Sequence, residues 1–252
     1  MKKAFNIVLL LLFLAGIVSC KKTIEEKELP TEFSSIGNIA ESVNQFRTLV
    51  GSLNTTVGNT IGRREINWDG VPDNFASQSL PIDFFNPIGS TANLSLQRGI
   101  TYESGGDFRV SATAFSEVAS NFASDITAFS GTKVFANVSA TAWQVGFQVA
   151  AESTAATVNA FGVVFIGVDL SNSSYIELLN GTESLGKFYA QPHNSISNFS
   201  FVGVHFKNTV FATVKIVHGN ASFKSGEKDI SKGGVKDLVA LDDFIYAEPR
   251  KK

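Results

Sequence analysis

From about residue 90 onward, apolar and polar residues alternate with a period of two, and Gly, Asn and Ser interrupt the pattern every few residues. Such alternation predicts half-buried β-strands, and the segments are rich in Val, Phe, Ile and Thr, which favour strands. We predict about nine strands, at residues 107–112, 133–138, 144–150, 158–169, 175–179, 184–191, 200–206, 211–217 and 238–246. Asn180-Gly181, between two of these segments, predicts a tight hairpin turn.

A helical pattern precedes the strands. Five apolar residues recur there at spacings of three and four, namely Ile36, Ile39, Val43, Phe46 and Val50. Ser34 or Ser35 can cap the start of this helix, and Gly51 can end it. Strands do not alternate with long helices, so a parallel α/β sheet is not expected. The pattern as a whole predicts a mainly β fold, a two-sheet antiparallel sandwich that is jelly-roll-like in size, with one short N-terminal amphipathic helix.

The composition narrows the class of protein. The chain has 252 residues, of which 44% are hydrophobic and 17% charged, so it can bury a full core and is not disordered. Its 22 Phe residues fit core packing between two sheets. A formal net charge of -2 argues against nucleic acid as a partner, because nucleic-acid binders present a basic surface. The single Cys excludes a disulfide framework and a Cys-rich zinc site.

The N-terminus predicts export. Two lysines precede an uncharged, mostly apolar run at residues 4–18, which is shorter than the ~20 residues that cross a bilayer as a helix. The following Ile17-Val18-Ser19-Cys20 resembles the bacterial lipoprotein box, in which an apolar residue and two small ones precede a Cys. This resemblance implies that Cys20 is lipidated through its sulfur and anchors the protein to the membrane. Lys21 in the next position implies the outer membrane.

The remaining boundaries follow from these segments. We predict a signal peptide at 1–19, a polar tether at 20–34, a single β-sandwich domain with its N-terminal helix at 35–249, and a short tail at 250–252. The tether is assigned because its residues are polar, include Pro30 and show no sustained periodicity.

Three segments of the body resemble a group of uncharacterised secreted bacterial proteins, many of which carry C-terminal sorting tails of the PEP-CTERM type. The segments are GRREINWDGVPD at 62–73, TVNAFGVVFIGVDLSNSSYIELLNGTESLGKFYA at 157–190 and LDDFIYAEP at 241–249. The resemblance covers roughly residues 40–249 and implies a secreted β-sandwich, without an established activity. The sequence departs from that group at Pro249-Arg250-Lys251-Lys252, which has no apolar sorting tail, and we expect the lipid on Cys20 to replace that anchor.

The first and last of these segments contain paired carboxylates. Asp69 and Asp73 lie in the first, and Asp242 and Asp243 in the last. One interpretation is a structural Ca²⁺ site, because Ca²⁺ takes six to eight oxygen ligands and a turn offers carboxylates beside backbone carbonyls. Asp242 and Asp243 also resemble the last strand of jelly-roll carbohydrate-binding modules, where an Asp often holds a structural calcium. The other interpretation is that these carboxylates accept hydrogen bonds from backbone N–H groups or pair with arginine.

We further predict that these two segments meet in the fold, although they lie far apart in the sequence. A loop that holds charged groups in a fixed geometry tolerates less change than an apolar strand does. The partners of the buried carboxylates would be Arg63 or Arg64, backbone amides or a bound Ca²⁺, because an unpaired buried charge costs several kcal/mol.

Motifs of catalysis are absent from the sequence: it has no Gly-x-Ser-x-Gly elbow, no His-Glu-x-x-His, no phosphate loop and no dinucleotide fingerprint. We therefore favour a membrane-anchored lipoprotein, facing the surface or the periplasm, that acts as a non-catalytic binding or adhesion module for glycan or for an envelope protein. The rings that could stack on sugar faces are Trp68, Tyr102, Tyr175 and Tyr189. The alternatives are a polysaccharide hydrolase, which needs two carboxylates about 5–10 Å apart, and a purely structural envelope protein.

Overall fold

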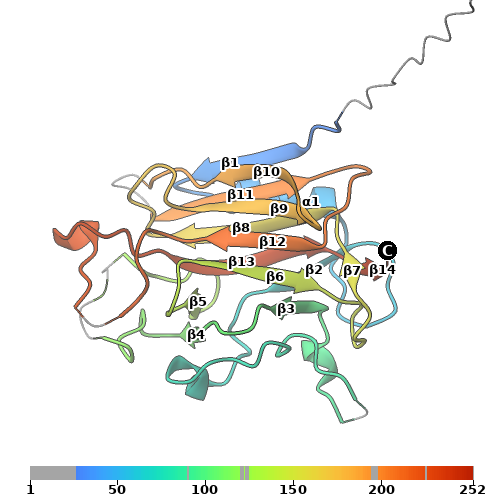
Figure 1. The fold of residues 1–252 in the computed structure, drawn as a ribbon, viewed down its shortest axis with the longest axis horizontal. Helices are drawn as coiled ribbons and strands as arrows, with labels where there is room; N and C mark the ends of the chain where they lie inside the picture. Colours follow the sequence, from blue (N-terminus) through green and yellow to red (C-terminus); the bar gives the residue numbers. More distant parts are fainter. Residues whose placement is uncertain are drawn as a thin grey trace, which may run out of the picture.

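The computed structural model describes residues 27–89, 91–119, 122, 125–193, 198–224 and 226–251. The predicted signal peptide and Cys20 lie outside the described residues. Two antiparallel sheets pack against each other, and the α-helix α1 (Ala40–Val50) lies beside them (Figure 1). The expected mainly β, two-sheet sandwich with one short N-terminal helix is confirmed. None of the described helices has the length and apolar character that crossing a lipid bilayer requires.

The larger sheet has seven strands. Its order is β1 (Thr31–Ile36), β11 (Phe199–His205), β8 (Ala160–Ile166), β13 (Ala240–Ala247), β5 (Val134–Asn137) and β4 (Phe108–Ser111), with β2 (Arg63–Ile66) also paired to β13. The smaller sheet has the order β10 (Glu183–Tyr189), β9 (Tyr175–Asn180), β12 (Thr213–Val217), β6 (Ala142–Phe147) and β3 (Ile100–Tyr102). A short ribbon joins β7 (Ala156–Thr157) to β14 (Arg250–Lys251), and 3₁₀ turns occur at Asp73–Ala76 (η1), Leu94–Leu96 (η2) and Ile230–Lys232 (η3).

Aromatic rings fill the space between the two sheets. Phe147 on β6 contacts Phe161 on β8 and Tyr246 on β13, with ring centroids 6.3 and 5.6 Å apart. Trp68, just after β2, stacks on Phe135 of β5 with 4.0 Å between ring centroids. Rings of this size carry much of the burial in a core, and paired rings add about 0.5–1.5 kcal/mol each. The prediction that the many Phe residues serve core packing is confirmed.

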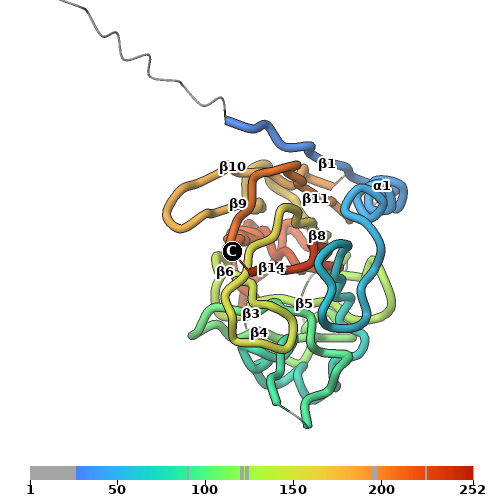
Figure 2. The backbone as a smooth tube through the Cα atoms, turned by 90° about the vertical axis from the view of Figure 1, so that its right-hand side faces the viewer, coloured from blue at the N-terminus to red at the C-terminus, as the bar shows by residue number. Residues whose placement is uncertain are grey.

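Helix α1 covers the outer face of the larger sheet, beside β1, β11 and β8 (Figure 2). Its Phe46 enters a hollow that two glycines leave on neighbouring strands, where Gly203 of β11 is paired with Gly162 of β8. A Cβ atom at Gly162 would lie 2.7 Å from Phe46, and one at Gly203 would lie 2.9 Å from it. Helix and second sheet thus cover both faces of β8, which is why every residue of that strand is buried.

The ends of α1 differ in how well they were predicted. Gly51 ends the helix as expected, with φ 117°. The start is corrected, because Ser34 and Ser35 lie in strand β1 and cannot cap a helix that begins at Ala40. The Oδ1 atom of Asn38 accepts a hydrogen bond from the Ala40 N–H at 3.4 Å instead.

The predicted tether at 20–34 and tail at 250–252 contain residues that belong to the folded domain. This corrects the prediction for the described parts of both segments. Strand β1 pairs with β11 along its full length, so the folded domain begins before residue 35. Glu28 accepts hydrogen bonds from the Thr209 hydroxyl and from the backbone N–H groups of residues 207–209, and these bonds hold its pKa at about 2. Arg250 and Lys251 pair with β7. Edge strands of this kind are held by main-chain bonds, which leave little trace in the hydrophobic pattern.

The two segments at 62–73 and 241–249 meet, as predicted. Strand β2 pairs antiparallel with β13, with Ile66 opposite Phe244. The Trp68 ring also lies 5.1 Å from the Phe244 ring. This pairing brings the charged residues of both segments to one side of the sandwich.

Candidate functional site

Four of the six arginines in the chain gather around strand β2. They are Arg47 on α1, Arg63 and Arg64 on β2, and Arg98 just before β3. Successive residues of a strand point to opposite sides, so Arg63 and Arg64 have different surroundings. Arg63 pairs with Glu65 at 2.5 Å near the surface, whereas Arg64 points into the fold.

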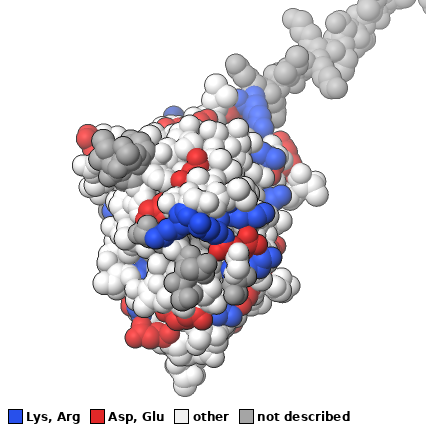
Figure 3. All heavy atoms as spheres, turned by 90° about the vertical axis from the view of Figure 1, so that its left-hand side faces the viewer, with Lys and Arg blue, Asp and Glu red and all other residues white. Residues whose placement is uncertain are grey.

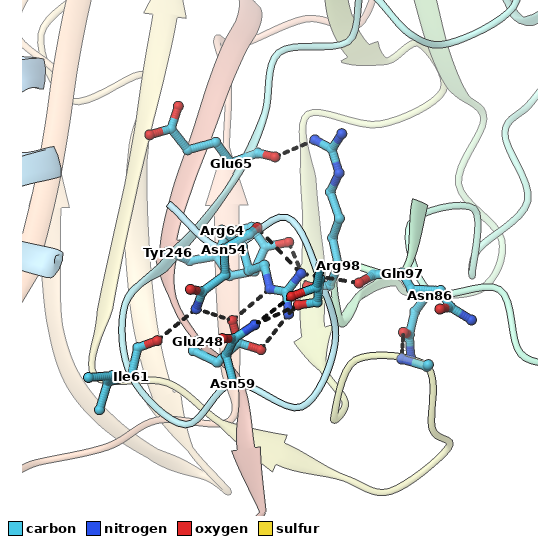
Figure 4. Close-up of polar contacts among 12 residues, drawn as sticks. Asn54, Asn59, Ile61, Arg64, Glu65, Asn86, Gln97, Arg98, Tyr246 and Glu248 are labelled. Atoms are coloured by element: carbon cyan, nitrogen blue, oxygen red, sulfur yellow. Dashed lines mark hydrogen bonds and ion pairs between the residues drawn. The ribbon is translucent and has the colours of Figure 1, made fainter. Parts of the chain in front are cut away.

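Arg64 and Glu248 form the buried base of the site (Figure 4). Arg64 Nε donates to Glu248 Oε2 at 2.6 Å and Nη2 donates to Oε1 at 2.7 Å, and both side chains are 2% exposed. The other guanidinium N–H groups donate to backbone carbonyls of neighbouring loops, including that of Thr56 at 2.7 Å. The Tyr246 hydroxyl donates to the carbonyl of Arg98 at 3.0 Å. This base therefore holds loops in place and has no free donor for a ligand.

Arg47 joins two carboxylates from different strands. Its Nη2 atom lies 3.0 Å from Glu65 Oε2 and 2.9 Å from Asp243 Oδ2. Burial raises the pKa of Asp243 above its ordinary value, although the Ser130 hydroxyl and Arg47 act in the opposite direction. The adjacent Asp242 is also affected, since burial and the Asp243 carboxylate raise its pKa to about 8.

A polar cavity of about 360 Å³ lies against these groups. Arg47, Asp243 and Arg98 line it, together with the polar side chains of Asn54, Asn67 and Ser95. Small-molecule sites in proteins have volumes of about 300–1,000 Å³, so the cavity has room for a small ligand. Its lining combines these charged and hydrogen-bonding groups with apolar surface that includes Leu53.

Arg98 differs from the other three arginines of this site. Among the described residues, its guanidinium forms no ion pair with a carboxylate. Its Nε donates to the Ser95 carbonyl at 3.0 Å, its Nη1 donates to the Glu65 carbonyl, and the group lies 5.6 Å from the centre of the Phe85 ring. Figure 4 shows the Arg98 side chain extended toward Glu65. The side chain is thus fixed in direction while its charge is not neutralised.

The site as a whole carries an excess of positive charge. Its four guanidinium groups face three carboxylates, those of Glu65, Asp243 and Glu248. Because burial raises the pKa of Asp243, protonation of that carboxyl would increase the excess. This balance favours an anionic group as the missing partner of Arg98.

The aspartates predicted as calcium ligands contact the segment 129–133. Asp69 accepts a backbone N–H of this segment at 2.8 Å, Asp242 accepts two at 2.7 and 3.0 Å, and Asp73 pairs with Lys133 at 2.7 Å. In the described part of the chain, no group of three metal-ligating side chains within ligand range includes any of the four. The geometry favours the interpretation without a metal ion, in which Asp69 and Asp242 accept backbone N–H groups while Asp73 and Asp243 pair with basic side chains.

Arg63 and Arg64, which were predicted to pair with the buried aspartates, have other partners. Asp243 pairs with Arg47 from the helix, because Arg63 is engaged with Glu65 and Arg64 with Glu248. Helix α1 packs on the face of the larger sheet beside β13, which places Arg47 within reach.

The four aromatic residues predicted for ligand binding fall into two pairs. Trp68 is 1% exposed and Tyr102 is 3% exposed, because both rings pack between the sheets, so neither can stack on a ligand. Tyr175 and Tyr189 are cross-strand partners on β9 and β10, with ring centroids 5.2 Å apart. Tyr189 is 37% exposed, so this pair is the one that a ligand can reach.

A second cluster lies away from the cavity, where Asp125, Asp169, His193, Asp229 and Asp237 converge. Burial, with the nearby carboxylates of Asp229 and Asp237, raises the pKa of Asp169 to about 7. Burial also raises the pKa of Asp237. Sequence reasoning missed this cluster, because its members come from separate loops and show no local spacing.

Sequence reasoning also missed Arg47, Arg98 and Glu248 as site residues. Arginine is rare in this chain, and the clustering of four of its six arginines around β2 is a tertiary feature. Arg98 stands alone between Gln97 and Gly99, with no motif to mark it. No protein-family model matches this chain, and a comparison with curated proteins finds no match.

Proposed function

We propose that this protein is a non-catalytic binding module, anchored to the outer membrane through a lipid on Cys20, and that the cavity at Arg98 is its ligand site. The observation that carries the proposal is the Arg98 guanidinium. It lines a polar cavity and is held by two backbone carbonyls, and among the described residues it has no carboxylate partner. A charged group fixed in this way is ready to receive an anion without further ordering.

The chemistry of the lining defines the class of ligand. A guanidinium binds a carboxylate with two parallel hydrogen bonds, which fix the direction of the ligand. Asn67 offers an amide donor and acceptor. The Asn54 amide and the Ser95 and Ser130 hydroxyls already donate within the protein, so they offer oxygen acceptors to the hydroxyl groups of a ligand. An acidic sugar residue of a glycan combines a carboxylate with such hydroxyls. We therefore assign the ligand class as acidic glycan.

Retention on polysaccharides tests this function. The purified full-length chain is passed over immobilised polyuronates and over neutral polysaccharides of similar size. We expect retention on the polyuronates alone, weakened by salt and lost in Arg98→Met. Arg109→Met is the matched control, because Arg109 pairs with Asp107 at 2.7 Å on β4, away from the cavity.

Absence of retention by folded protein on every polysaccharide would reject the glycan ligand. A structural envelope protein would then be the better interpretation. Retention that Arg98→Met leaves unchanged would place the ligand elsewhere, for example on the exposed tyrosine pair of β9 and β10.

One observation favours a second candidate function, a polysaccharide hydrolase. Glu65 and Asp243 both line the cavity and both contact the same Nη2 atom of Arg47. Their contacting oxygens are therefore less than about 6 Å apart, a range that includes the roughly 5–5.5 Å between the carboxyl groups of retaining glycosidases. Their environments also differ, since burial raises the pKa of Asp243. A hydrolase would release new reducing ends from a bound polyuronate, and Glu65→Gln or Asp243→Asn would stop that release while binding persists. We expect no release.

A further inference from the structure

The cluster of Asp125, Asp169, His193, Asp229 and Asp237 lies at the end of the sandwich that is on the left of Figure 1. Asp169 follows strand β8, His193 follows β10, and Asp229 and Asp237 flank η3 ahead of β13. The ligand atoms of Asp125, Asp169 and His193 all lie within 4.8 Å of one another, and so do those of Asp169, Asp229 and Asp237. Asp169 is common to both groups and therefore links them.

The negative charge of this cluster has little compensation. Asp229 and Asp237 are completely buried. Among the described residues, the basic group within 4.0 Å of these carboxylates is His193, whose ring nitrogens lie 3.7 Å from Asp125 Oδ2 and from Asp169 Oδ1. Figure 3 looks onto this end of the molecule and shows basic side chains in a band across its surface. The exposed lysines of the adjoining segment, Lys224, Lys228 and Lys232, form no ion pair with the cluster.

Two carboxylate oxygens inside the cluster lack any hydrogen-bond donor. They are Asp125 Oδ2 and Asp169 Oδ2, and both atoms are buried. The whole Asp169 side chain is only 11% exposed, so water does not replace the missing donor easily. A buried carboxylate oxygen without a donor is costly, and such an atom in a folded protein calls for a partner.

The tautomer of His193 strengthens this point. Its Nδ1 lies 2.9 Å from the Val168 carbonyl, which can only accept a hydrogen bond. In the neutral ring the hydrogen therefore sits on Nδ1, and Nε2 presents a lone pair. The Nε2 atom lies 3.7 Å from Asp125 Oδ2, which itself has no donor. With the ring in this tautomer no hydrogen lies between these two acceptor atoms, which are 3.7 Å apart, and one metal ion can bind both.

We propose that this cluster is a binding site for a divalent metal ion, with Asp169 as its central ligand and Asp229, Asp237, Asp125 and His193 around it. Within each of the two groups, the spacing of at most 4.8 Å fits three ligands that share one ion at about 2.0–2.6 Å, and Asp169 belongs to both groups. The donor set is rich in carboxylate oxygen, which favours Ca²⁺, and the single imidazole leaves room for Mn²⁺ or Zn²⁺.

The carboxylates on the buried side are held in place for this role. Asp229 Oδ1 accepts the Leu238 N–H at 2.7 Å, and Asp237 Oδ1 accepts the Asp169 N–H at 3.0 Å. Each of these two Oδ1 atoms has two lone pairs and accepts one of these backbone bonds, so one lone pair remains for an ion. The Oδ2 atoms of the same residues each accept two hydrogen bonds within the protein. Backbone donors of this kind fix the orientation of metal ligands. A bound ion would join the loops that leave β8 and β10 to the segment before β13.

The test is metal binding by purified full-length protein that has been treated with EDTA and freed of the chelator. Ca²⁺, Mg²⁺, Mn²⁺ and Zn²⁺ are titrated separately, with calorimetry for stoichiometry and the melting temperature as a second readout. We expect one ion per chain and a rise in Tm of about 5–10 °C at a free concentration a hundred times Kd. Asp169→Asn should weaken binding at least about tenfold. Asp83→Asn, at an exposed aspartate away from the cluster, should leave binding unchanged.

The Asp169→Asn variant also distinguishes a metal site from a cluster of carboxyl groups that only share protons with one another. Asp169→Asn removes one charge from the cluster and should raise the Tm of the metal-free protein, so its folding is not in question. In the proposed site this variant needs at least about ten times more free metal than the wild type for the same rise in Tm. A wild-type protein whose Tm and calorimetric signal respond to none of the four ions would overturn the proposal, and so would an Asp169→Asn variant that binds as tightly as the wild type.

Discussion

Arg64 and Glu248 lie 184 positions apart in the chain, yet they form a doubly hydrogen-bonded ion pair in which both side chains are 2% exposed. The pair links strand β2 to the residue that follows β13, directly beneath the cavity at Arg98. A buried pair of this kind is costly to break, because the remaining partner becomes an unpaired buried charge. Loss of either side chain in the floor of the proposed ligand site would therefore strongly destabilise the fold.

Removal of either member of this pair should destabilise the protein strongly. Arg64→Met should lower the free energy of unfolding by about 3–5 kcal/mol, since it leaves Glu248 buried and unpaired. The double variant Arg64→Met/Glu248→Gln should recover part of that loss. Urea denaturation measures both effects. Arg109→Met, which breaks a more exposed ion pair, should cost no more than about 1 kcal/mol; an equal cost would refute the special role of burial.

The hollow under helix α1 gives a second prediction. Gly203→Ala places a Cβ atom 2.9 Å from Phe46, so the variant should lose about 1–3 kcal/mol of stability through overpacking. Adding Phe46→Leu should reduce the penalty of the alanine, a coupling that a double-mutant cycle measures. Gly70→Ala serves as the control, because a Cβ there meets nothing within 4 Å. Equal effects of the two alanines would contradict this packing.

His218 gives a pH dependence whose sign follows from its burial. Its Nδ1 lies 2.7 Å from the Val239 carbonyl, and burial lowers its pKa below the ordinary value. Below about pH 6.5 the His218 imidazole is protonated in the unfolded chain but stays neutral in the folded chain. This residue therefore makes the free energy of unfolding fall as the pH decreases from 7 to 5. Asp242, with its pKa raised to about 8, acts in the opposite direction.

The contribution of His218 is isolated by comparison with His218→Asn, which keeps a hydrogen-bond donor near Nδ1. Urea midpoints at pH 5, 6, 7 and 8 should show a smaller loss on acidification in the variant than in the wild type. Parallel pH profiles for the two proteins would show that His218 does not carry the effect.

Much of the fold follows from the hydrophobic pattern, for reasons that particular strands make clear. Each predicted strand has a counterpart. The hairpin expected at Asn180-Gly181 forms one residue later, because Asn180 pairs with Glu183 and leaves Gly181 and Thr182 as the two-residue turn. Strand β2 was not predicted, since its four residues include three charged ones, Arg63, Arg64 and Glu65. Main-chain pairing to β13 makes it a strand, and that partner lies far away in the sequence.

The site was predictable only in part. The charged residues of the segments at 62–73 and 241–249 indicated a meeting point, and the pairing of β2 with β13 confirms it. Arg47 and Arg98 reach the same point from a helix and a loop, and no spacing in the sequence links them. For Trp68 the sequence left two interpretations open, a ring that stacks on a ligand and a ring that packs beneath its own loop, and the structure shows it packed in the core.

The most direct test of the account is the affinity of the cavity for acidic sugars. Calorimetric titration with short oligomers of galacturonic, glucuronic and mannuronic acid at low salt measures it for the wild type, Arg98→Met and Tyr189→Ala. We predict one binding site per chain for at least one of these oligomers, at least tenfold weaker in Arg98→Met and unchanged in Tyr189→Ala. Binding that Arg98→Met leaves intact, or a wild type that binds none of the three, would contradict the assignment of this cavity.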